Sequence, residues 1–441
     1  MIEDPYTPGS ASPAYLSGRG HELAVIDELA ARVRSLGRSG GPLLAFYGPR
    51  GTGKTSLLRH AQAEAHRAGM FTAWVTGRGD ASMVDALAKS LNRAVGTASL
   101  GEKANGLLHR IDQVQVEFGL PGAKVGAQFA SKTKAADVVH DLLEDTARFA
   151  RNHKHHGLLL FVDEFHEASV EDRKSLLIAL QEFDGDSISP TPVGIVAAGL
   201  PSIHAAITEA ATFGERTRFI EVKGLTPAAA AEALRLPAER LGVDWDDHAI
   251  AAAVELAHTY PYKVQIVGSC TWNFARPAAN SVITEGHVRG ATDDIEDRMD
   301  ELYRTRWAAA SPAHRRILQA IAAGGGDTAT RDQIAARVGK STNDLSRPRD
   351  ELIERGLIAP SGRGQVTYTI PGFGAYIRRR IATELDDSPT AGRAQPLVSP
   401  PANSVSATLQ AGALRPGNPS PPTHQSDDQG DQPNRPAPPA P

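Results

Sequence analysis

One octapeptide, GPRGTGKT at residues 48–55, constrains the fold more than any other part of this chain. It follows an apolar stretch at residues 41–47 (GPLLAFY) and precedes a stretch with helical periodicity at residues 54–68. Glycines at this spacing permit a tight loop whose backbone N–H groups converge, and the start of a helix adds positive potential at the same point. The pattern G-x-x-x-x-G-K-[ST] between a strand and a helix therefore predicts a loop that binds the phosphates of a nucleotide.

Two side chains of this loop have distinct expected roles. Lys54 is expected to reach the β- and γ-phosphates, and Thr55 is expected to coordinate Mg²⁺. The predicted ligands are ATP and Mg²⁺, because these are what such a loop is built to hold. The alternative is a glycine-rich turn with an exposed lysine, but the flanking strand and helix favour the phosphate-binding loop. The residues predicted to bind the nucleotide here are Gly48, Pro49, Arg50, Gly51, Thr52, Gly53, Lys54, Thr55 and Ser56.

A second acidic element lies about a hundred residues further along the chain. The run LLLFVDE at residues 158–164 predicts a buried strand that ends in Asp163 and Glu164. Ligands bind at the carboxyl ends of strands in open α/β sheets, so both carboxylates are expected beside the phosphates. Asp163 is predicted to hold Mg²⁺, and Glu164 is predicted to polarise the attacking water as a general base.

The pattern of short apolar runs alternating with amphipathic helices predicts an α/β fold with a parallel sheet. Between the second and third strands, residues 96–133 exceed what a minimal phosphate-loop core needs, and within them residues 119–129 suggest a hairpin. Strands are predicted at residues 41–47, 71–76, 158–162, 193–198 and, more weakly, 219–222, and helices at residues 54–68, 83–95 and 135–152.

The sequence divides into further segments on composition. After Leu225 it is helical throughout, and Thr226 followed by Pro227 suits the start of a helix. The tail holds thirteen of the thirty prolines and predicts disorder, because it offers too little apolar surface to offset the entropy of ordering. The expected segments are a flexible N-terminus (1–15), a phosphate-loop core (16–224), a helical lid domain (225–307), a winged helix (308–381) and a disordered proline-rich tail (386–441).

Together the two motifs resemble those of AAA+ ATPases, in the branch shared by archaeal-type ATPases, origin-recognition ATPases and signal-transducing STAND NTPases. The resemblance extends over residues 15–380. It implies that Arg19 lines the adenine pocket, and that Arg216, favoured over Arg218, is an arginine finger that acts in a neighbouring subunit. It also implies that Pro261 takes the place of the proline with which STAND proteins couple the lid to the nucleotide; a proline that merely starts a helix is the alternative.

The strand that ends at Ala198 departs from that family. Members usually carry a polar residue there to align the attacking water, whereas this strand ends in the apolar sequence AAGLP at residues 197–201. Slow hydrolysis is therefore expected.

The C-terminal segment is unusually basic. Residues 308–381 contain twelve Lys and Arg and six Asp and Glu, so this segment carries +6 and the rest of the chain −10. In a DNA-binding winged helix the second helix of the pair enters the major groove. Pro348 within that helix speaks against this unless the helix starts at Ser346. The residues expected to contact DNA are Lys340, Ser341, Asn343, Ser346, Arg347, Arg349 and Arg363, with three arginines at 378–380 as further candidates.

Other features limit the class of protein. A single cysteine, Cys270, excludes an internal disulfide framework, and neither a signal peptide nor an apolar run of membrane-spanning length is evident. A cytoplasmic protein with no membrane contact is expected. Three hypotheses follow: an ATP-hydrolysing switch, for which a homo-oligomer is one open possibility; a DNA-binding regulator or initiator that uses ATP as a conformational ligand; and a signalling scaffold whose winged helix binds an unidentified protein partner.

Overall fold

The computed structural model describes residues 2–10, 13, 15–80, 82–97, 135–186 and 188–386. These residues fall within one unit, Met1–Asp387. The predicted hairpin, most of the predicted insertion and the predicted disordered tail lie outside the described residues. No helix in the described part of the chain is both long and apolar enough to cross a membrane.

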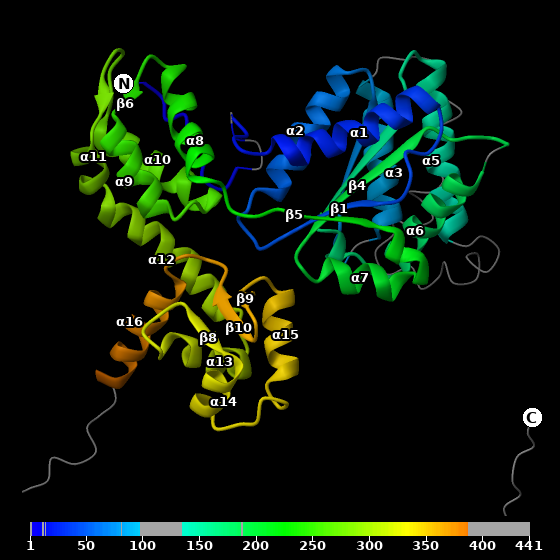
Figure 1. Cartoon of the computed structure of the whole chain (residues 1–441). Helices are drawn as coiled ribbons and strands as arrows, with labels where there is room; N and C mark the ends of the chain where they lie inside the picture. Colours follow the sequence, from blue (N-terminus) through cyan, green and yellow to red (C-terminus); the bar gives the residue numbers. More distant parts are fainter. Residues whose placement is uncertain are drawn as a thin grey trace, which may run out of the picture. The chain divides into compact units, whose positions relative to one another are not determined.

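A five-stranded parallel sheet forms the core, in the order β2-β3-β4-β1-β5 (Figure 1). The predicted strands are confirmed, with small shifts at their ends. The first begins at Leu44 because Gly41 takes a positive φ of 105° just before it, which is not a strand conformation. The strands are β1 (Leu44–Tyr47), β2 (Phe71–Thr76), β3 (Leu158–Asp163), β4 (Val193–Gly199) and β5 (Arg218–Glu221).

Helices cover both faces of the sheet, because alternate side chains of its strands are apolar on both sides. Phe46, Leu159 and Phe161 belong to the core under α1 (Gly20–Leu36) and α2 (Lys54–Arg67). Ala45 and Leu160 belong to the opposite core. The helices over that opposite core are α3 (Met83–Thr97), α5 (Ala135–Asn152), α6 (Val170–Gly185) and α7 (Ile203–Ala210).

All strands of a parallel sheet end at one edge, and this edge carries the predicted site. Tyr47, the last residue of β1, pairs with Gly199 of β4, while Thr76 of β2 pairs with Asp163 of β3. The loop after β1 and the acidic end of β3 therefore face the same side. A 3-10 turn, η3 (Phe165–Glu167), follows β3 immediately, and a second one, η4 (Thr212–Arg216), precedes β5.

The helical segment after β5 begins where the sequence predicts. The side chain of Thr226 accepts a hydrogen bond from the N–H of Ala229, and Pro227 is the first residue of the helix. The elements of this lid are α8 (Pro227–Glu239), β6 (Asp244–Trp245), α9 (Asp247–Ala257), α10 (Pro261–Ala275), β7 (Val282–Ile283) and α11 (Glu285–Gly290).

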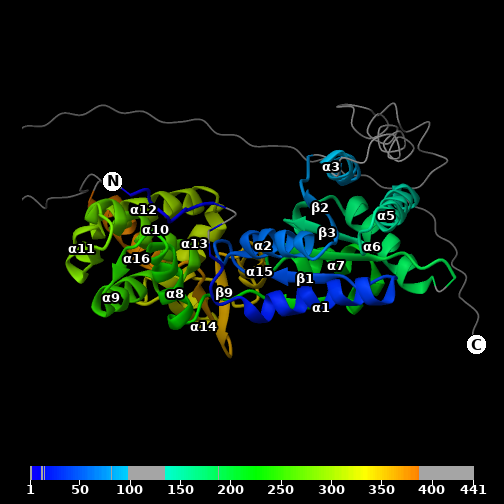
Figure 2. The same ribbon diagram turned by 90° about the horizontal axis from the view of Figure 1, so that it is seen from above.

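The N-terminal segment is not the flexible extension that its composition suggests, and this expectation was wrong. Tyr6 is 3% exposed and lies in the apolar core of the lid. Its hydroxyl donates to the carbonyl of Leu234 at 2.5 Å and accepts from Nε1 of Trp245 at 2.9 Å. Asp4 accepts a hydrogen bond from the hydroxyl of Ser269. The N-terminus accordingly lies beside the lid helices in both views (Figure 2).

The C-terminal part contains helices and a small sheet, and its assignment as a winged helix stays a prediction. Its antiparallel sheet has the order β8-β10-β9. The helix α12 packs against α10 and α11 of the lid and also against α16. The elements are α12 (Thr292–Ala308), α13 (Pro312–Ala322), β8 (Thr328–Thr330), α14 (Arg331–Val338), α15 (Ser346–Glu354), β9 (Ile358–Gly362), β10 (Gln365–Tyr368) and α16 (Phe373–Asp386).

Pro348 is compatible with the second helix of this module. The helix α15 starts at Ser346, so Pro348 lies in its first turn, where the missing N–H would have had no partner within the helix. The objection raised by the sequence therefore does not apply.

Candidate nucleotide site

The loop between β1 and α2 has the geometry expected of a phosphate-binding loop. Gly51 and Gly53 take positive φ angles of 79° and 88°, which residues with a side chain rarely adopt. Lys54 is buried, and its Nζ donates to the carbonyl oxygens of Gly48 and Pro49, both at 2.8 Å. Burial lowers the pKa of Lys54 to about 8. The nearby Glu164 and Asp163 oppose this effect, but the hydrogen bonds of Nζ go to neutral carbonyls only, and a buried cation bonded in this way favours the arrival of an anion.

Thr55 and Asp163, 108 residues apart in the sequence, are brought together at the same edge of the sheet. The hydroxyl of Thr55 donates to Oδ2 of Asp163 at 2.8 Å. Burial raises the pKa of Asp163, as expected for a carboxylate that lacks a full cationic partner. A hydroxyl and a carboxylate oxygen side by side are hard oxygen donors of the kind that Mg²⁺ prefers. These residues fit the predicted ion.

Glu164 lies next to this pair in an unusual backbone conformation. Its φ of 49° is in the left-handed region, and its N–H donates to Oδ1 of Asp163 at 3.0 Å. Oε1 is 3.7 Å from the guanidinium of Arg50. Oε2 is buried and has no hydrogen-bond partner among the described residues. An unpaired carboxylate oxygen at this edge can accept a hydrogen bond from water, as a general base must.

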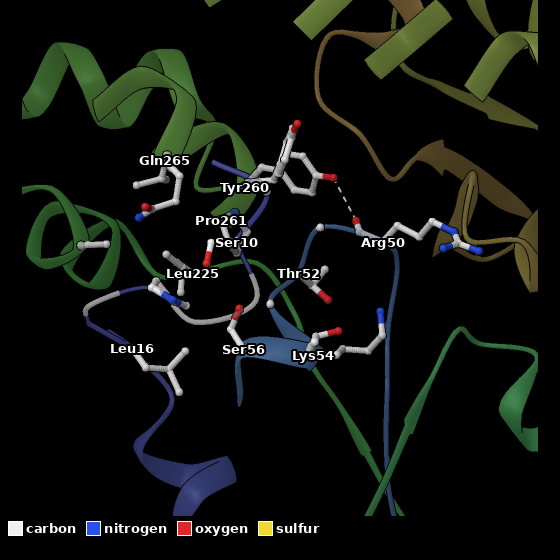
Figure 3. A pocket seen from close by; sticks show the side chains of 18 of the residues that line it. Ser10, Leu16, Arg50, Thr52, Lys54, Ser56, Leu225, Tyr260, Pro261 and Gln265 are labelled. Carbon is white, nitrogen blue, oxygen red and sulfur yellow. Dashed lines mark hydrogen bonds between the residues drawn. The ribbon is translucent and has the colours of Figure 1, made fainter. Parts of the chain in front are cut away.

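A cavity of about 460 Å³ opens at the loop, and the N-terminal segment and the lid complete its wall (Figure 3). Its size is that of a typical small-ligand site. The side chains that line it include Lys54, Thr55, Ser56 and Glu164 from the core, Ser10 and Leu16 from the N-terminal segment, and Tyr260, Pro261 and Gln265 from the lid.

Tyr260 connects the lid directly to the loop. Its hydroxyl donates to the carbonyl of Arg50 at 2.9 Å (Figure 3). The N–H of Tyr262 also donates to the carbonyl of Gly51 at 3.3 Å. Pro261, between them, is the first residue of α10 and lines the cavity. The position of Pro261 is thus compatible with both interpretations, a coupling residue and a helix start.

Arg19 lines the cavity, but its guanidinium is engaged by the protein itself. It is 4% exposed and pairs with Glu22 at 3.2 Å. It also donates to the carbonyls of Thr52 at 2.8 Å and Lys223 at 2.7 Å. Burial lowers the pKa of Arg19, and the nearby Glu22 opposes that effect. Arg19 therefore ties the loop to the segment that enters the lid.

Arg216 is not part of this cavity. It lies in η4, before the start of β5, where Arg218 pairs with Leu44 at the amino end of the sheet. Its side chain is exposed, whereas Arg218 forms an ion pair with Glu28 at 3.1 Å. Arg216 can therefore serve as a finger only for the site of another subunit, and that role stays a prediction.

Two side chains near the site were missed in the sequence. Arg306 of α12 lines the cavity, and its Nε is buried without a hydrogen-bond partner in the described part of the chain. Burial and the positive charge of Arg50 lower the pKa of Arg306. His166 of η3 lies 3.6 Å from Oε2 of Glu164. Both could have been noticed: Arg306 adjoins an apolar stripe that includes Tyr303, and His166 follows the acidic pair.

The basic residues of the C-terminal part differ in how far they are neutralised. Arg347 pairs with Glu351 at 3.0 Å, and Arg349 pairs with Asp350 at 2.7 Å. By contrast, Lys340 and Arg363 are exposed, and neither forms a salt bridge with a described carboxylate. Among the other candidates, Ser341 and Asn343 are exposed, and the hydroxyl of Ser346 accepts a hydrogen bond from Arg331. Arg378 forms an ion pair with Asp327, and Arg379 forms one with Asp300. The guanidinium of Arg380 lies over the ring of Trp307.

Comparison with known proteins agrees with this geometry. The family described as AAA ATPase domain matches residues 15–188, and a domain of unknown function, DUF8462, matches residues 300–377. No curated protein matches the chain. Among solved structures, a Walker-type ATPase of Pyrococcus abyssi has a TM-score of 0.57 at 16% identity, covering 84% of this chain and 98% of its own. The ORC2 protein of Aeropyrum pernix, in an ADP form, has a TM-score of 0.51 at 15% identity, with coverage of 84% and 96%.

Identities this low establish a common fold rather than a common activity. The family match covers the loop, Asp163 and Glu164, and the two structural similarities extend over the core and beyond it. Residues 15–188 therefore match the AAA ATPase domain, and the part of the chain covered by these neighbours has the fold of an AAA+ P-loop ATPase.

Proposed function

We propose that this protein is a switch that binds ATP with Mg²⁺, hydrolyses it slowly and relays the state of the nucleotide to its C-terminal module. The position of Arg306 is the main observation that supports coupling between the nucleotide and the C-terminal module. It lies on α12, which packs against both the lid and α16, and it lines the nucleotide cavity. A change at the phosphates can therefore act directly on the helix that enters the C-terminal module.

The electrostatics of Arg306 support this role. Arg306 is half-buried, its Nε has no hydrogen-bond partner among the described residues, and the positive charge of Arg50 adds repulsion, which is unfavourable. A triphosphate in the cavity supplies the missing negative charge. Binding of ATP would thus stabilise one position of α12, and loss of the terminal phosphate would weaken that preference.

In the chemical step, the residues of the core have separate roles. Lys54 and the loop backbone would hold the phosphates, and Thr55 and Asp163 would hold the ion, which would neutralise developing charge on the phosphates. Glu164 accepts a hydrogen bond from the attacking water and orients it. The apolar end of β4 offers no side chain for this task, and we therefore expect turnover to be slow.

The test uses the full chain and Glu164→Gln. We expect the variant to bind ATP within a few-fold of the parent in calorimetry, while phosphate release falls by about 100-fold or more. Hydrogen exchange on this variant, with and without ATP and Mg²⁺, should show altered protection in residues 308–381. Parental phosphate release from Glu164→Gln would refute the assignment of the base.

A matched pair of variants then tests the relay. Arg306→Met removes the cation that faces the cavity, while Arg304→Met removes an exposed arginine from the same helix. The ATP-dependent change in exchange should vanish in the first and persist in the second. An unaltered response in Arg306→Met would show that the relay does not pass through α12.

Binding of duplex DNA is a second candidate function. It is favoured by the +6 charge of residues 308–381 together with the exposed Lys340 and Arg363. Because Arg347 and Arg349 are paired with carboxylates of their own helix, the hairpin turn at Arg363 is the better candidate for phosphate contact. A protein partner on the same surface is the outcome if no DNA binding is found.

A further inference from the structure

His166 occupies the place that a side chain at the end of β4 would otherwise fill. A Cβ atom added at Gly199 would lie 2.9 Å from Nδ1 of His166, which is closer than real contacts of this kind. The glycine is therefore required by the imidazole that approaches it. The end of β4 thus lacks a polar side chain because the imidazole of His166 fills the space that such a side chain would need.

The imidazole is held firmly and in one form. Its side chain is 6% exposed, and Nδ1 accepts a hydrogen bond from the N–H of Leu200 at 3.3 Å. Acceptance at Nδ1 places the proton on Nε2, which lies 3.3 Å from Oε1 of Glu167 but forms no hydrogen bond within the described part of the chain. The carbonyl of His166 accepts from the guanidinium of Arg173 at 3.0 Å. The ring is thus fixed between the end of β4 and the turn after β3.

This ring limits where the carboxylate of Glu164 can lie. Oε2 of Glu164 is 3.6 Å from Nδ1 of His166, and Oε1 faces Arg50 at 3.7 Å. Because Nδ1 already accepts from Leu200, it has no proton to give to Oε2. The oxygen therefore keeps its capacity to accept a hydrogen bond, which matches its lack of a partner among the described residues.

We infer that His166 is the positioning residue for hydrolysis: its ring, packed against the end of β4, blocks one side of the Glu164 carboxylate and offers Oε2 no proton, so that Oε2 stays free for water. The inference rests on the proposed function, since it requires Glu164 to act on water. It assigns to the turn after β3 a task for which β4 has no side chain. His166 itself touches neither phosphate nor water in this role.

The first experiment is a double-mutant cycle on the full chain. His166→Ala should lower kcat by about tenfold with the KM for ATP within threefold, because a misplaced base affects the chemical step and not binding. In a Glu164→Gln background the same change should have no further effect, since the two residues act as one unit. His204→Ala is the matched control, because His204 is half-buried against Tyr47 and Phe219 and should leave kcat unchanged.

A second experiment exchanges the two positions. In His166→Asn, Oδ1 stands close to the original Nδ1 and can accept from Leu200, so this variant should recover most of the lost turnover. Gly199→Asn alone should impair the protein because its Cβ would meet the ring. Combined with His166→Ala, it no longer meets the ring and its nearest neighbours are atoms of Ile203, at 3.1 Å and 3.2 Å, so the double variant should be tolerated better than Gly199→Asn and should raise kcat above that of His166→Ala.

The outcomes separate this inference from the proposed function. If the parent binds ATP but Glu164→Gln hydrolyses it as fast as the parent, the proposed function fails first. If Glu164→Gln is inactive while His166→Ala keeps the parental kcat, or the two changes are additive, the inference on His166 fails and the function stands. A rise in KM without a fall in kcat would also overturn it.

Discussion

The buried hydroxyl of Tyr6 allows a quantitative test of the N-terminal anchor. In Tyr6→Phe the ring stays between Trp245 and Trp272. It meets both edge to face, with distances between ring centroids of 6.4 Å and 6.1 Å. Only the two hydrogen bonds are lost, to the carbonyl of Leu234 and from Nε1 of Trp245. Each partner left unpaired in the core costs about 1–3 kcal/mol, so we expect a loss of roughly 2–6 kcal/mol in the free energy of unfolding of the lid.

Tyr6→Ala should destabilise the lid further, because loss of a buried aromatic ring typically costs about 3–5 kcal/mol. The residues that follow Tyr6 line the nucleotide cavity, so this variant should also bind ATP more weakly. Urea unfolding followed by tryptophan fluorescence reports the first effect, since Trp245 and Trp272 flank the ring. Calorimetry with ATP reports the second.

The control for this prediction is Tyr15→Phe. Tyr15 belongs to the same segment but is half-buried, and its ring lies beneath the guanidinium of Arg240. This change should alter stability by less than about 0.5 kcal/mol, as is usual away from buried networks. If Tyr6→Phe unfolds at the same urea concentration as Tyr15→Phe, the N-terminal segment is not anchored as described.

The remaining predictions concern the ion, the relay and the basic surface. Thr55→Val should remove most of the increase in ATP affinity that Mg²⁺ produces, measured by calorimetry with Mg²⁺ and with EDTA; an intact Mg²⁺ effect would contradict the assignment. Arg306→Met should raise the melting temperature without nucleotide, because it removes a half-buried cation that is repelled by Arg50. It should also weaken ATP binding by about tenfold or more, the value of a charged hydrogen bond; a fall in both would contradict the argument. Replacing Lys340 and Arg363 with alanine should lower the salt dependence of any duplex binding by about two in log–log slope, and an unchanged slope would exclude this surface.

The parts of the fold that the sequence predicts are those that depend on local chemistry. The loop from Gly48 to Thr55 requires glycines at fixed places, and a buried strand that ends in Asp163 and Glu164 is recognisable from its apolar run. Strand and helix positions in the core follow from the same patterns. Each of these features depends on residues within about ten positions of one another, so no knowledge of distant contacts is needed.

The parts that escaped prediction depend on contacts between distant segments. The residues around Tyr6 in the sequence are mostly polar, and they predict a flexible terminus. The buried partners of Tyr6 are Leu234 and Trp245, which are more than two hundred residues away in the sequence. Arg306 is one of several arginines in its helix, and only the fold shows that it lines the cavity. The role of Gly199 likewise becomes visible only when His166 is seen against it.

The left-handed backbone at Glu164 bears on how this protein responds to selection. A residue with a Cβ in that conformation costs roughly 1–2 kcal/mol, a penalty that glycine avoids. Glu164→Gly would therefore relieve strain while eliminating the candidate base. Directed evolution that selects only for heat resistance should therefore enrich inactive variants with glycine at position 164. A screen that also requires ATP turnover should retain the glutamate despite its backbone strain.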